Sequence, residues 1–255
     1  RHFESGVYGV MSREKKVLFV TGASSDVGQA LILQIADQYD TIVAHYCHSH
    51  EDIDGLAKKF PGKIQKVKAD LADSKEVQTM IDGMIKEKWL PDHIVHLAAP
   101  KTMNERFHKM DLASLDQTFE VSVRSIFHIL QSFMPHMSKQ KYGRVVLMLT
   151  SYCLGVPPKY QSAYVTSKYA LLGLMKALAT EYDSKGITVN GISPEMIDTK
   201  FLSDLPDLIV EENAAKSPLK RNLQVDDVVP MITYLLSDQA EAITGQNIAI
   251  TGGMR

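Results

Sequence analysis

Short apolar runs alternate with amphipathic stretches along most of the chain. Runs of β-type residues predict seven strands: Val17–Val20, Thr41–Tyr46, Ile64–Ala69, Asp92–Leu97, Val145–Leu149, Ile187–Ile192 and Asn247–Ile250. Helical spacing of apolar residues predicts helices between them: one beginning near Ala30, then Glu51–Phe60, Ser74–Lys88, Asp111–Ser138, Ser162–Ser184 and Asp226–Ser237. Because strands and helices alternate without linker or repeat, the pattern predicts an α/β fold with a doubly wound, mostly parallel sheet and helices on both faces.

The ends of this pattern indicate the domain boundaries. Residues 1–10 precede Met11 and contain no apolar signal core, so we expect an added tag or a flexible arm there. Residues 11–255 are expected to form one domain. Within it, residues 200–223 are polar and irregular, carry Pro206 and Pro218, and follow a predicted strand. We expect this segment to be a mobile lid over the substrate.

The carboxyl ends of the predicted strands carry most of the candidate functional residues. Gly22, Asp70, Ala98, Ser151 and Pro194 each follow a different predicted strand. Open parallel sheets bind ligands at this edge, near the point where the strand order reverses. The five positions therefore predict one ligand site.

A glycine-containing turn follows the first strand at once. It reads TGASSDVG over residues 21–28 and leads into a helix, an arrangement that places backbone N–H groups where a phosphate can bind. Asp26 stands where a dinucleotide turn commonly has its middle glycine. A carboxylate there is unfavourable unless it points away, for example as an N-cap. An ordinary glycine turn is the alternative interpretation.

The end of the second strand bears on cofactor choice. It reads HYCHS over residues 45–49, with no acidic residue before Glu51. In nucleotide-binding βαβ units an acid here binds the 2′-hydroxyl of the adenosine ribose and repels a 2′-phosphate. Its absence favours NADP over NAD, although no Arg or Lys is present to grip the phosphate. The histidines have no Cys or carboxylate partner at clear spacing, so we expect no metal site.

The stretch from Leu147 to Lys168 carries the clearest catalytic chemistry. Ser151 follows a strand, and Tyr164 and Lys168 lie one helical turn apart on one face. The ammonium of Lys168 is expected to lower the pKa of Tyr164, so that its hydroxyl can exchange a proton with an alcohol oxygen. Ser151 is expected to hold the same oxygen by a hydrogen bond. Taken alone, Tyr-x-x-x-Lys also occurs by chance on amphipathic helices.

Composition narrows the class of partner. The chain has 28 basic and 30 acidic residues, a net charge of −2 and no long block of like charge, which argues against nucleic acid. No apolar run is long enough to span a bilayer, so we expect no membrane partner. The two cysteines, Cys47 and Cys153, lack metal-type spacing and fit a reducing, cytoplasmic location.

Taken together, the motifs of the chain resemble those of the short-chain dehydrogenase/reductase family, from Val17 to Gly253. The motifs are TGASSDVG (21–28), AD (69–70), Ser151, YVTSK (164–168), SPEMIDT (193–199) and ITGQNIAITGG (243–253). The resemblance implies a seven-stranded Rossmann fold, assembly as homotetramers or homodimers, and hydride transfer between a nicotinamide and a small alcohol or carbonyl compound. It implies that Tyr164 is the general acid–base, that Lys168 lowers its pKa and binds the nicotinamide ribose, and that Ser151 positions the substrate oxygen.

The resemblance and the ribose-end argument together assign the residues that contact the cofactor. They are Gly22, Ser24, Ser25, Asp26, Val27 and Gly28 in the turn, Tyr46, Cys47 and His48 at the 2′ end, Asp70 and Leu71 by the adenine, Leu97, Ala98 and Ala99 by the ribose, Tyr164 and Lys168, and Pro194, Ile197 and Thr199 towards the carboxamide. The leading interpretation is an NADP-preferring reductase, in which the nicotinamide supplies the hydride and Tyr164 the proton.

The chain departs from the pattern of that family in four places. Residues 96–99 read His-Leu-Ala-Ala in place of Asn-Asn-Ala-Gly, Ser122 replaces a catalytic helix Asn, Glu195 replaces a Gly, and Thr251 replaces an Asp. Ser122 is expected either to act as the fourth catalytic residue or to bond only its own helix backbone. These departures motivate the alternative interpretation, a weakly active or non-catalytic dinucleotide-binding scaffold or sensor of the same fold. The substrate is not predicted, because the segments expected to shape its pocket (100–107, 154–160 and 200–223) match no ligand pattern.

Overall fold

The computed structural model describes residues 15–101 and 104–254, so the expected tag or arm lies outside the described residues. The strands are β1 (Val17–Thr21), β2 (Thr41–Tyr46), β3 (Ile64–Lys68), β4 (His93–His96), β5 (Gly143–Met148), β6 (Ile187–Pro194) and β7 (Asn247–Ile250). The helices are α1 (Asp26–Ile35), α2 (Glu51–Lys59), α3 (Ser74–Lys86), α4 (Leu112–Phe119), α5 (Ser125–Gln140), α6 (Ser162–Glu181), α7 (Asp207–Lys216) and α8 (Val225–Leu236). A π-helical segment, Glu120–Arg124, joins α4 to α5.

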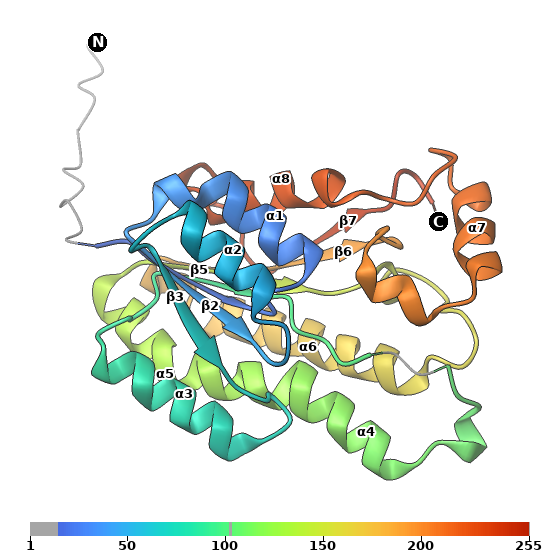
Figure 1. The fold of residues 1–255 in the computed structure, drawn as a ribbon, viewed down its shortest axis with the longest axis horizontal. Coiled ribbons are helices and arrows are strands. Elements are labelled where there is room, and N and C mark those ends of the chain that lie inside the picture. The colour runs from blue at the N-terminus through green and yellow to red at the C-terminus, as the bar shows by residue number, and fades with distance from the viewer. Residues whose placement is uncertain (1–14, 102–103, 255) are drawn as a thin grey trace, which may run out of the picture.

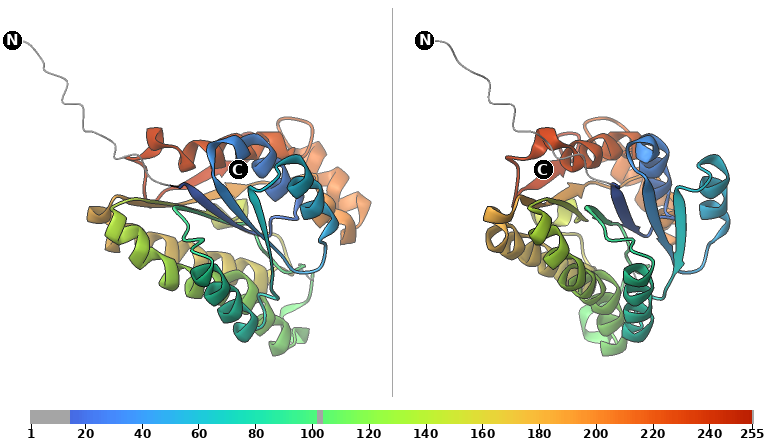
Figure 2. Two further views of the ribbon diagram at one scale, coloured as in Figure 1. Left: turned by 60° about the vertical axis from the view of Figure 1, so that its left-hand side comes forward. Right: turned by 90° about the vertical axis from the view of Figure 1, so that its left-hand side faces the viewer.

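All seven strands pair in parallel in one sheet, in the order β3-β2-β1-β4-β5-β6-β7. The strand order reverses between β1 and β4, which is where doubly wound sheets bind their ligands. Helices cover both faces, with α1, α2 and α8 on one side and α3 to α6 on the other (Figures 1 and 2). The predicted doubly wound, parallel α/β fold is therefore confirmed.

Two apolar cores, one on each face of the sheet, hold these layers together. In β1, Leu18 and Val20 join the core under α1 and α8, whereas Val17 and Phe19 join the core under α3, α5 and α6. Successive residues of a strand point to opposite faces, so a strand covered on both sides must be apolar throughout. Burial on both faces therefore explains the apolar run from which β1 was predicted.

One expectation about helix geometry was wrong, and the possibility that Asp26 caps its helix is not the arrangement observed. The helix expected over Asp111–Ser138 is interrupted by the π-helical segment, whose extra residue in one turn barely disturbs the spacing of apolar positions. The N-cap of α1 is Ser25, whose side chain accepts the N–H of Gly28, and Asp26 is instead the first helical residue. Ser and Asp are both good N-caps, so the sequence alone could not decide between neighbours.

The segment 200–223 is more regular than expected. It contains a 3-10 turn, Lys200–Asp204, followed by α7. No residue of α7 is buried, so this helix has no apolar stripe from which it could be predicted. Among the described residues, no helix of the fold is long and apolar enough to cross a membrane.

Candidate active site and cofactor groove

The turn after β1 lies against the loop after β4. Gly22 has a φ of +69°, and a Cβ placed on it would lie 2.9 Å from the backbone nitrogen of Ala98. At Gly28 a Cβ would lie 2.8 Å from the backbone of Ala23, so α1 packs closely on the end of β1. Only glycine satisfies both the positive φ and the close approach at position 22. Two of the predicted cofactor-binding segments are thereby brought together.

Gly22→Ala is expected to destabilise the protein by about 1–3 kcal/mol and to weaken dinucleotide binding, because the added methyl group must push the Ala98 loop away. Urea unfolding and a cofactor titration would measure the two effects. Gly83 is the matched control, since a Cβ there meets nothing within 4 Å and the residue lies inside α3. Gly83→Ala should stabilise the fold slightly. Equal stabilities for the two variants would contradict the close-approach argument.

Two buried histidines support this turn, and sequence reasoning missed both roles. His45, at the end of β2, accepts the N–H of Gly22 at Nδ1 (3.1 Å), and its Nε2 lies 3.0 Å from the carbonyl oxygen of Ala69. A carbonyl only accepts, so Nε2 carries the hydrogen. Burial lowers the pKa of His45 to about 4, so the ring is neutral near pH 7. The only sign of this role in the sequence was that His45 is a polar residue inside an apolar strand run. Such a residue is more often a buried, hydrogen-bonded histidine than a metal ligand.

The second of these histidines, His96, connects the turn to the π-helical segment. Its Nδ1 lies 2.7 Å from the hydroxyl of Thr21, and its Nε2 lies 3.2 Å from the carbonyl oxygen of Ser122. Since Nε2 must donate to that carbonyl, Thr21 donates to Nδ1. Burial first, and then the nearby charge of Lys168, lowers the pKa of His96 to about 3. His96, one of the departures from the family pattern, is thus an uncharged side chain whose two hydrogen bonds link β1 to the π-helical segment that carries Ser122.

The predicted catalytic residues come together at the carboxyl end of β5. Ser151 begins a 3-10 turn that packs against α6, the helix of Tyr164 and Lys168. The Nζ of Lys168 lies 5.5 Å from the centroid of the Tyr164 ring and donates a 2.7 Å hydrogen bond to the carbonyl of Met148. The hydroxyl of Ser151 is buried and has no hydrogen-bond partner among the described residues. A buried hydroxyl in this state indicates a position where a ligand or water supplies the missing partner.

The expected lowering of the pKa of Tyr164 is wrong for the protein as it stands. Burial raises the pKa of Tyr164 well above its ordinary value, and a hydrogen bond from the side chain of Thr150 only partly opposes this. Burial also lowers the pKa of Lys168 to about 8, because its side chain is 1% exposed. The desolvation of both groups outweighs the attraction that their sequence spacing suggested. Near pH 7, Tyr164 is protonated and Lys168 is mostly charged.

Ser122 does not bond its own helix backbone, which was one of its two expected states. It lies fully buried in the π-helical segment, and its hydroxyl has no partner in the described part of the chain. The π-helical segment packs on α6, so this second unpartnered hydroxyl belongs to the same region as Tyr164 and Lys168. Segments of π-helix often occur at functional sites. The catalytic role expected for Ser122 stays a prediction.

The other predicted cofactor residues lie along the same carboxyl edge. Val27, Leu71, Leu97 and Pro194 are buried, and Ser25 and His48 are exposed. Most of the others are half-buried: Ser24, Tyr46, Cys47, Asp70, Ala98, Ala99, Ile197 and Thr199 among them. The carboxylate of Asp70 accepts the N–H of Ala72, and that of Asp26 accepts the N–H of Lys200 instead of capping α1. Within residues 15–101 and 104–254, no group of His, Cys, Asp and Glu side chains is arranged to hold a metal ion.

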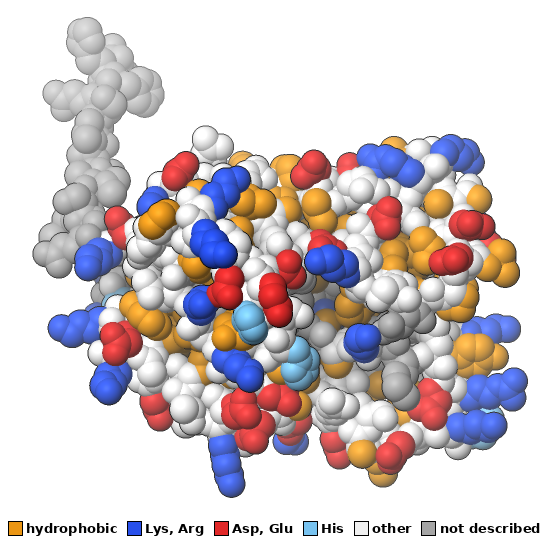
Figure 3. Space-filling view, viewed as in Figure 1, with side chains coloured by type: hydrophobic (Ala, Val, Ile, Leu, Met, Phe, Trp, Pro, Cys, Tyr) orange, Lys and Arg blue, Asp and Glu red, His pale blue; other side chains and the backbone are white. Residues whose placement is uncertain are grey.

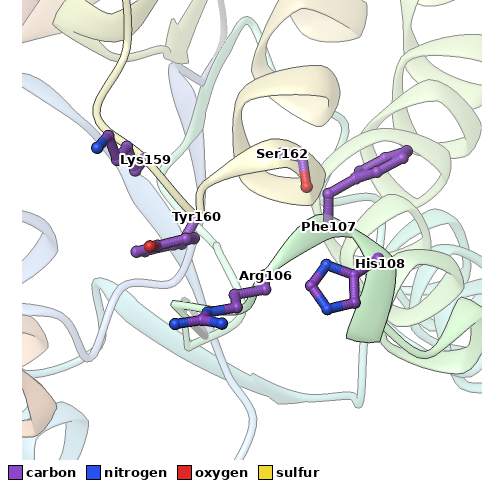
Figure 4. A pocket seen from close by; sticks show the side chains of 6 residues that line it. All are labelled: Arg106, Phe107, His108, Lys159, Tyr160 and Ser162. Atoms are coloured by element: carbon purple, nitrogen blue, oxygen red, sulfur yellow. The ribbon is translucent and has the colours of Figure 1, made fainter.

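A pocket of about 500 Å³ opens beside the start of α6 (Figure 4). It is lined by Arg106, Phe107, His108, Lys159, Tyr160 and Ser162. The backbone N–H of Glu105 donates to the carbonyl of Tyr160 (3.1 Å), which joins two of the segments expected to shape the substrate site. On the face shown in Figure 3, acidic and basic side chains are interspersed without a large field of one sign.

Comparison with known proteins agrees with this geometry. The family model described as enoyl-(acyl carrier protein) reductase matches residues 22–255. The 3-oxoacyl-(acyl-carrier-protein) reductase FabG of Staphylococcus aureus is 30% identical over 242 residues, which cover 94% of this chain and 98% of that relative. An NADPH-dependent aldehyde reductase-like protein of Arabidopsis thaliana is 29% identical, and the match covers 93% of this chain and 93% of that relative.

Solved structures match over a similar length. A short-chain dehydrogenase/reductase from Serratia marcescens superposes with a TM-score of 0.84 at 27% identity, covering 94% of this chain and 97% of that one. The fold, the order of the motifs and the full-length match with a 30% identical relative lead to one assignment: the chain belongs to the short-chain dehydrogenase/reductase family of oxidoreductases.

Proposed function

We propose that this protein reduces a small carbonyl compound to an alcohol with NADPH. The observation that carries the proposal is the buried, unpartnered hydroxyl of Ser151 beside Tyr164 and Lys168. A substrate carbonyl oxygen would accept a hydrogen bond from Ser151 and remove the cost of its unmet bond. The nicotinamide, when bound, supplies the hydride.

Tyr164 then acts as the proton donor. Because burial raises its pKa, the hydroxyl is protonated at neutral pH and ready to donate. A developing alkoxide is a much stronger base than a phenolate, so the proton moves from Tyr164 to the product oxygen. The ammonium of Lys168, which is mostly present below about pH 8, stabilises the phenolate left behind. Ser151 fixes the orientation of the oxygen during this step.

The groove at the carboxyl edge fits a dinucleotide. The glycine turn allows a pyrophosphate to approach the first N–H groups of α1, which have no partner within the helix. Tyr46, Cys47 and His48 follow β2 without an acidic residue, which supports NADPH over NADH. The name of the Arabidopsis relative supports the same choice.

A fluorescence titration with NADPH and, separately, with NADH tests the proposed preference for NADPH. NADPH should bind at least about tenfold more tightly, since an acid that would repel its 2′-phosphate is missing. An NADPH oxidation assay with aldehydes, ketones and 3-oxoacyl thioesters would follow. Tighter binding of NADH would overturn the NADPH preference. If a nucleotide binds but no carbonyl compound is reduced, the weakly active or non-catalytic dinucleotide-binding scaffold or sensor, which the departures at His96 and Ser122 support, becomes the better interpretation. If neither nucleotide binds, the proposed function is overturned.

The assembly and location proposed for the protein rest on separate features. Exposed Phe127 and Tyr169 on α5 and α6, with Gly173 and Ala177 on the outer side of α6, support a homodimer or homotetramer formed through these helices. Both cysteines carry free thiols, which supports a reducing, cytoplasmic location. We further propose one domain over residues 11–255, with residues 200–223 as the lid over the substrate.

A further inference from the structure

Asp26, the unexpected acid of the glycine turn, is bonded to a segment far away in the sequence. Its Oδ2 accepts the backbone N–H of Lys200 at 2.7 Å. Its Oδ1 lies 4.0 Å from the Nζ of Lys200, and Oδ2 of Asp52, in the first turn of α2, lies 3.6 Å from the same Nζ. The three residues Asp26, Asp52 and Lys200 are called the latch below. The latch joins the starts of α1 and α2 to the chain that leaves β6 (Figure 1).

The latch completes a two-point attachment of the segment after β6. On one side, the N–H of Asp198 donates to the carbonyl of Leu223 (2.8 Å), and the N–H of Leu223 donates to the carbonyl of Met196 (3.0 Å). On the other side, Asp26 holds Lys200. Thr199, which is expected to contact the carboxamide end of the cofactor, lies between these two anchors. The position of Thr199 relative to the glycine turn therefore depends on Asp26.

The charges explain why an acid is tolerated in this turn. A carboxylate in the first turn of a helix interacts favourably with the helix dipole, but it would repel a pyrophosphate bound there. The ammonium of Lys200 offsets that repulsion, and Asp52 interacts with the same ammonium. Asp26 and Asp52 are 26% and 32% exposed, whereas Lys200 is 74% exposed, so the ion pairs alone are weak. The charge-assisted bond from the backbone N–H is the stronger contact.

We propose that Asp26 is a positioning residue, which fixes the segment after β6 across the cofactor groove and so slows cofactor release. The proposal rests on the proposed function for the identity of the cofactor, but the anchoring itself can be measured without any ligand. An oxygen that accepts the N–H of Lys200 is the essential feature. Asp26→Asn keeps that oxygen and loses the charge, whereas Asp26→Ala loses both.

Amide hydrogen exchange of the unliganded protein tests the anchoring directly. In Asp26→Ala the amide of Lys200 and its neighbours, residues 199–203, should exchange about tenfold faster, because a hydrogen bond to a charged acceptor is lost. Asp26→Asn should stay within about threefold of wild type. Asp54→Ala is the control. Asp54 lies on the same helix as Asp52 but forms its 2.6 Å ion pair with Lys66 of β3 and none with Lys200. Unchanged exchange in Asp26→Ala would overturn the proposal.

Stopped-flow release of NADPH then tests the consequence. Asp26→Ala should release NADPH several-fold faster than wild type and raise the KM for NADPH. Asp26→Asn should release NADPH more slowly than Asp26→Ala, because it keeps an oxygen that can accept the N–H of Lys200. If Asp26 only repelled the phosphate, both variants would bind NADPH more tightly than wild type, which would overturn the positioning role. A wild-type protein that binds no NADPH would instead overturn the proposed function, and the exchange experiment would still decide whether Asp26 anchors the segment.

Discussion

Replacing Tyr164 by phenylalanine is expected to lower kcat for carbonyl reduction by about 100- to 10,000-fold, the range that general acid catalysis typically supplies. The substitution removes only the hydroxyl, so the ring keeps its edge-on contact with Tyr152, whose centroid lies 6.3 Å away. Affinity for NADPH should therefore change little. Steady-state kinetics and the fluorescence titration would separate the two quantities.

Tyr169 offers a matched control for this experiment. It lies on the same helix, is 46% exposed and is not expected to touch substrate or cofactor. Tyr169→Phe should leave kcat and NADPH affinity unchanged. Substantial turnover in Tyr164→Phe would exclude Tyr164 as the proton donor. A loss of NADPH binding together with turnover would assign the hydroxyl to cofactor binding instead.

The strands β1, β2, β4, β5 and β6 were predictable because each is buried along nearly its whole length. The edge strands β3 and β7 are only partly buried, and their β-type residues made them predictable. The bounds predicted for Thr41–Tyr46 and Asn247–Ile250 are those observed. The edge on which Gly22, Asp70, Ala98, Ser151 and Pro194 gather follows from the parallel order, which confirms that part of the prediction. The pattern of apolar residues contains this information because burial on a sheet depends on position along the strand.

What the sequence could not supply were contacts between distant segments and the effects of burial. Nothing local to Asp26 indicates Lys200, which lies 174 positions later in the chain. The bridge through His96 depends on the meeting of β1, β4 and the π-helical segment, and that segment leaves no clear mark on the apolar spacing. The spacing of Tyr164 and Lys168 showed that they face each other but not that both are desolvated. Desolvation is the larger influence on the pKa of Tyr164, so the direction expected from spacing alone was wrong.

The burial of Lys168 leads to the second large effect, on stability. Its folded-state pKa of about 8 lies below the ordinary value of 10.5, so between these two pH values the unfolded chain binds more protons than the folded one. Stability must then rise with pH across this interval, relative to a protein without the group. Below about pH 8 the buried ammonium is destabilising, and this penalty fades as pH approaches 10.5.

Comparison with Lys168→Met should reveal this pH dependence. The difference in the free energy of unfolding between wild type and the variant is expected to change with pH. Methionine fills similar space without a charge. Between pH 7 and 10 the free energy of unfolding of wild type, measured with urea, should therefore rise by about 2–3 kcal/mol relative to that of the variant. The lost hydrogen bond to the carbonyl of Met148 shifts the difference by a roughly constant amount, so the slope with pH is the diagnostic quantity. Lys176→Met, at an exposed position of the same helix, should keep a constant difference from wild type. Parallel stability profiles for wild type and Lys168→Met would mean that Lys168 keeps an ordinary pKa, and the charge assigned to it during proton transfer would then persist well above pH 8.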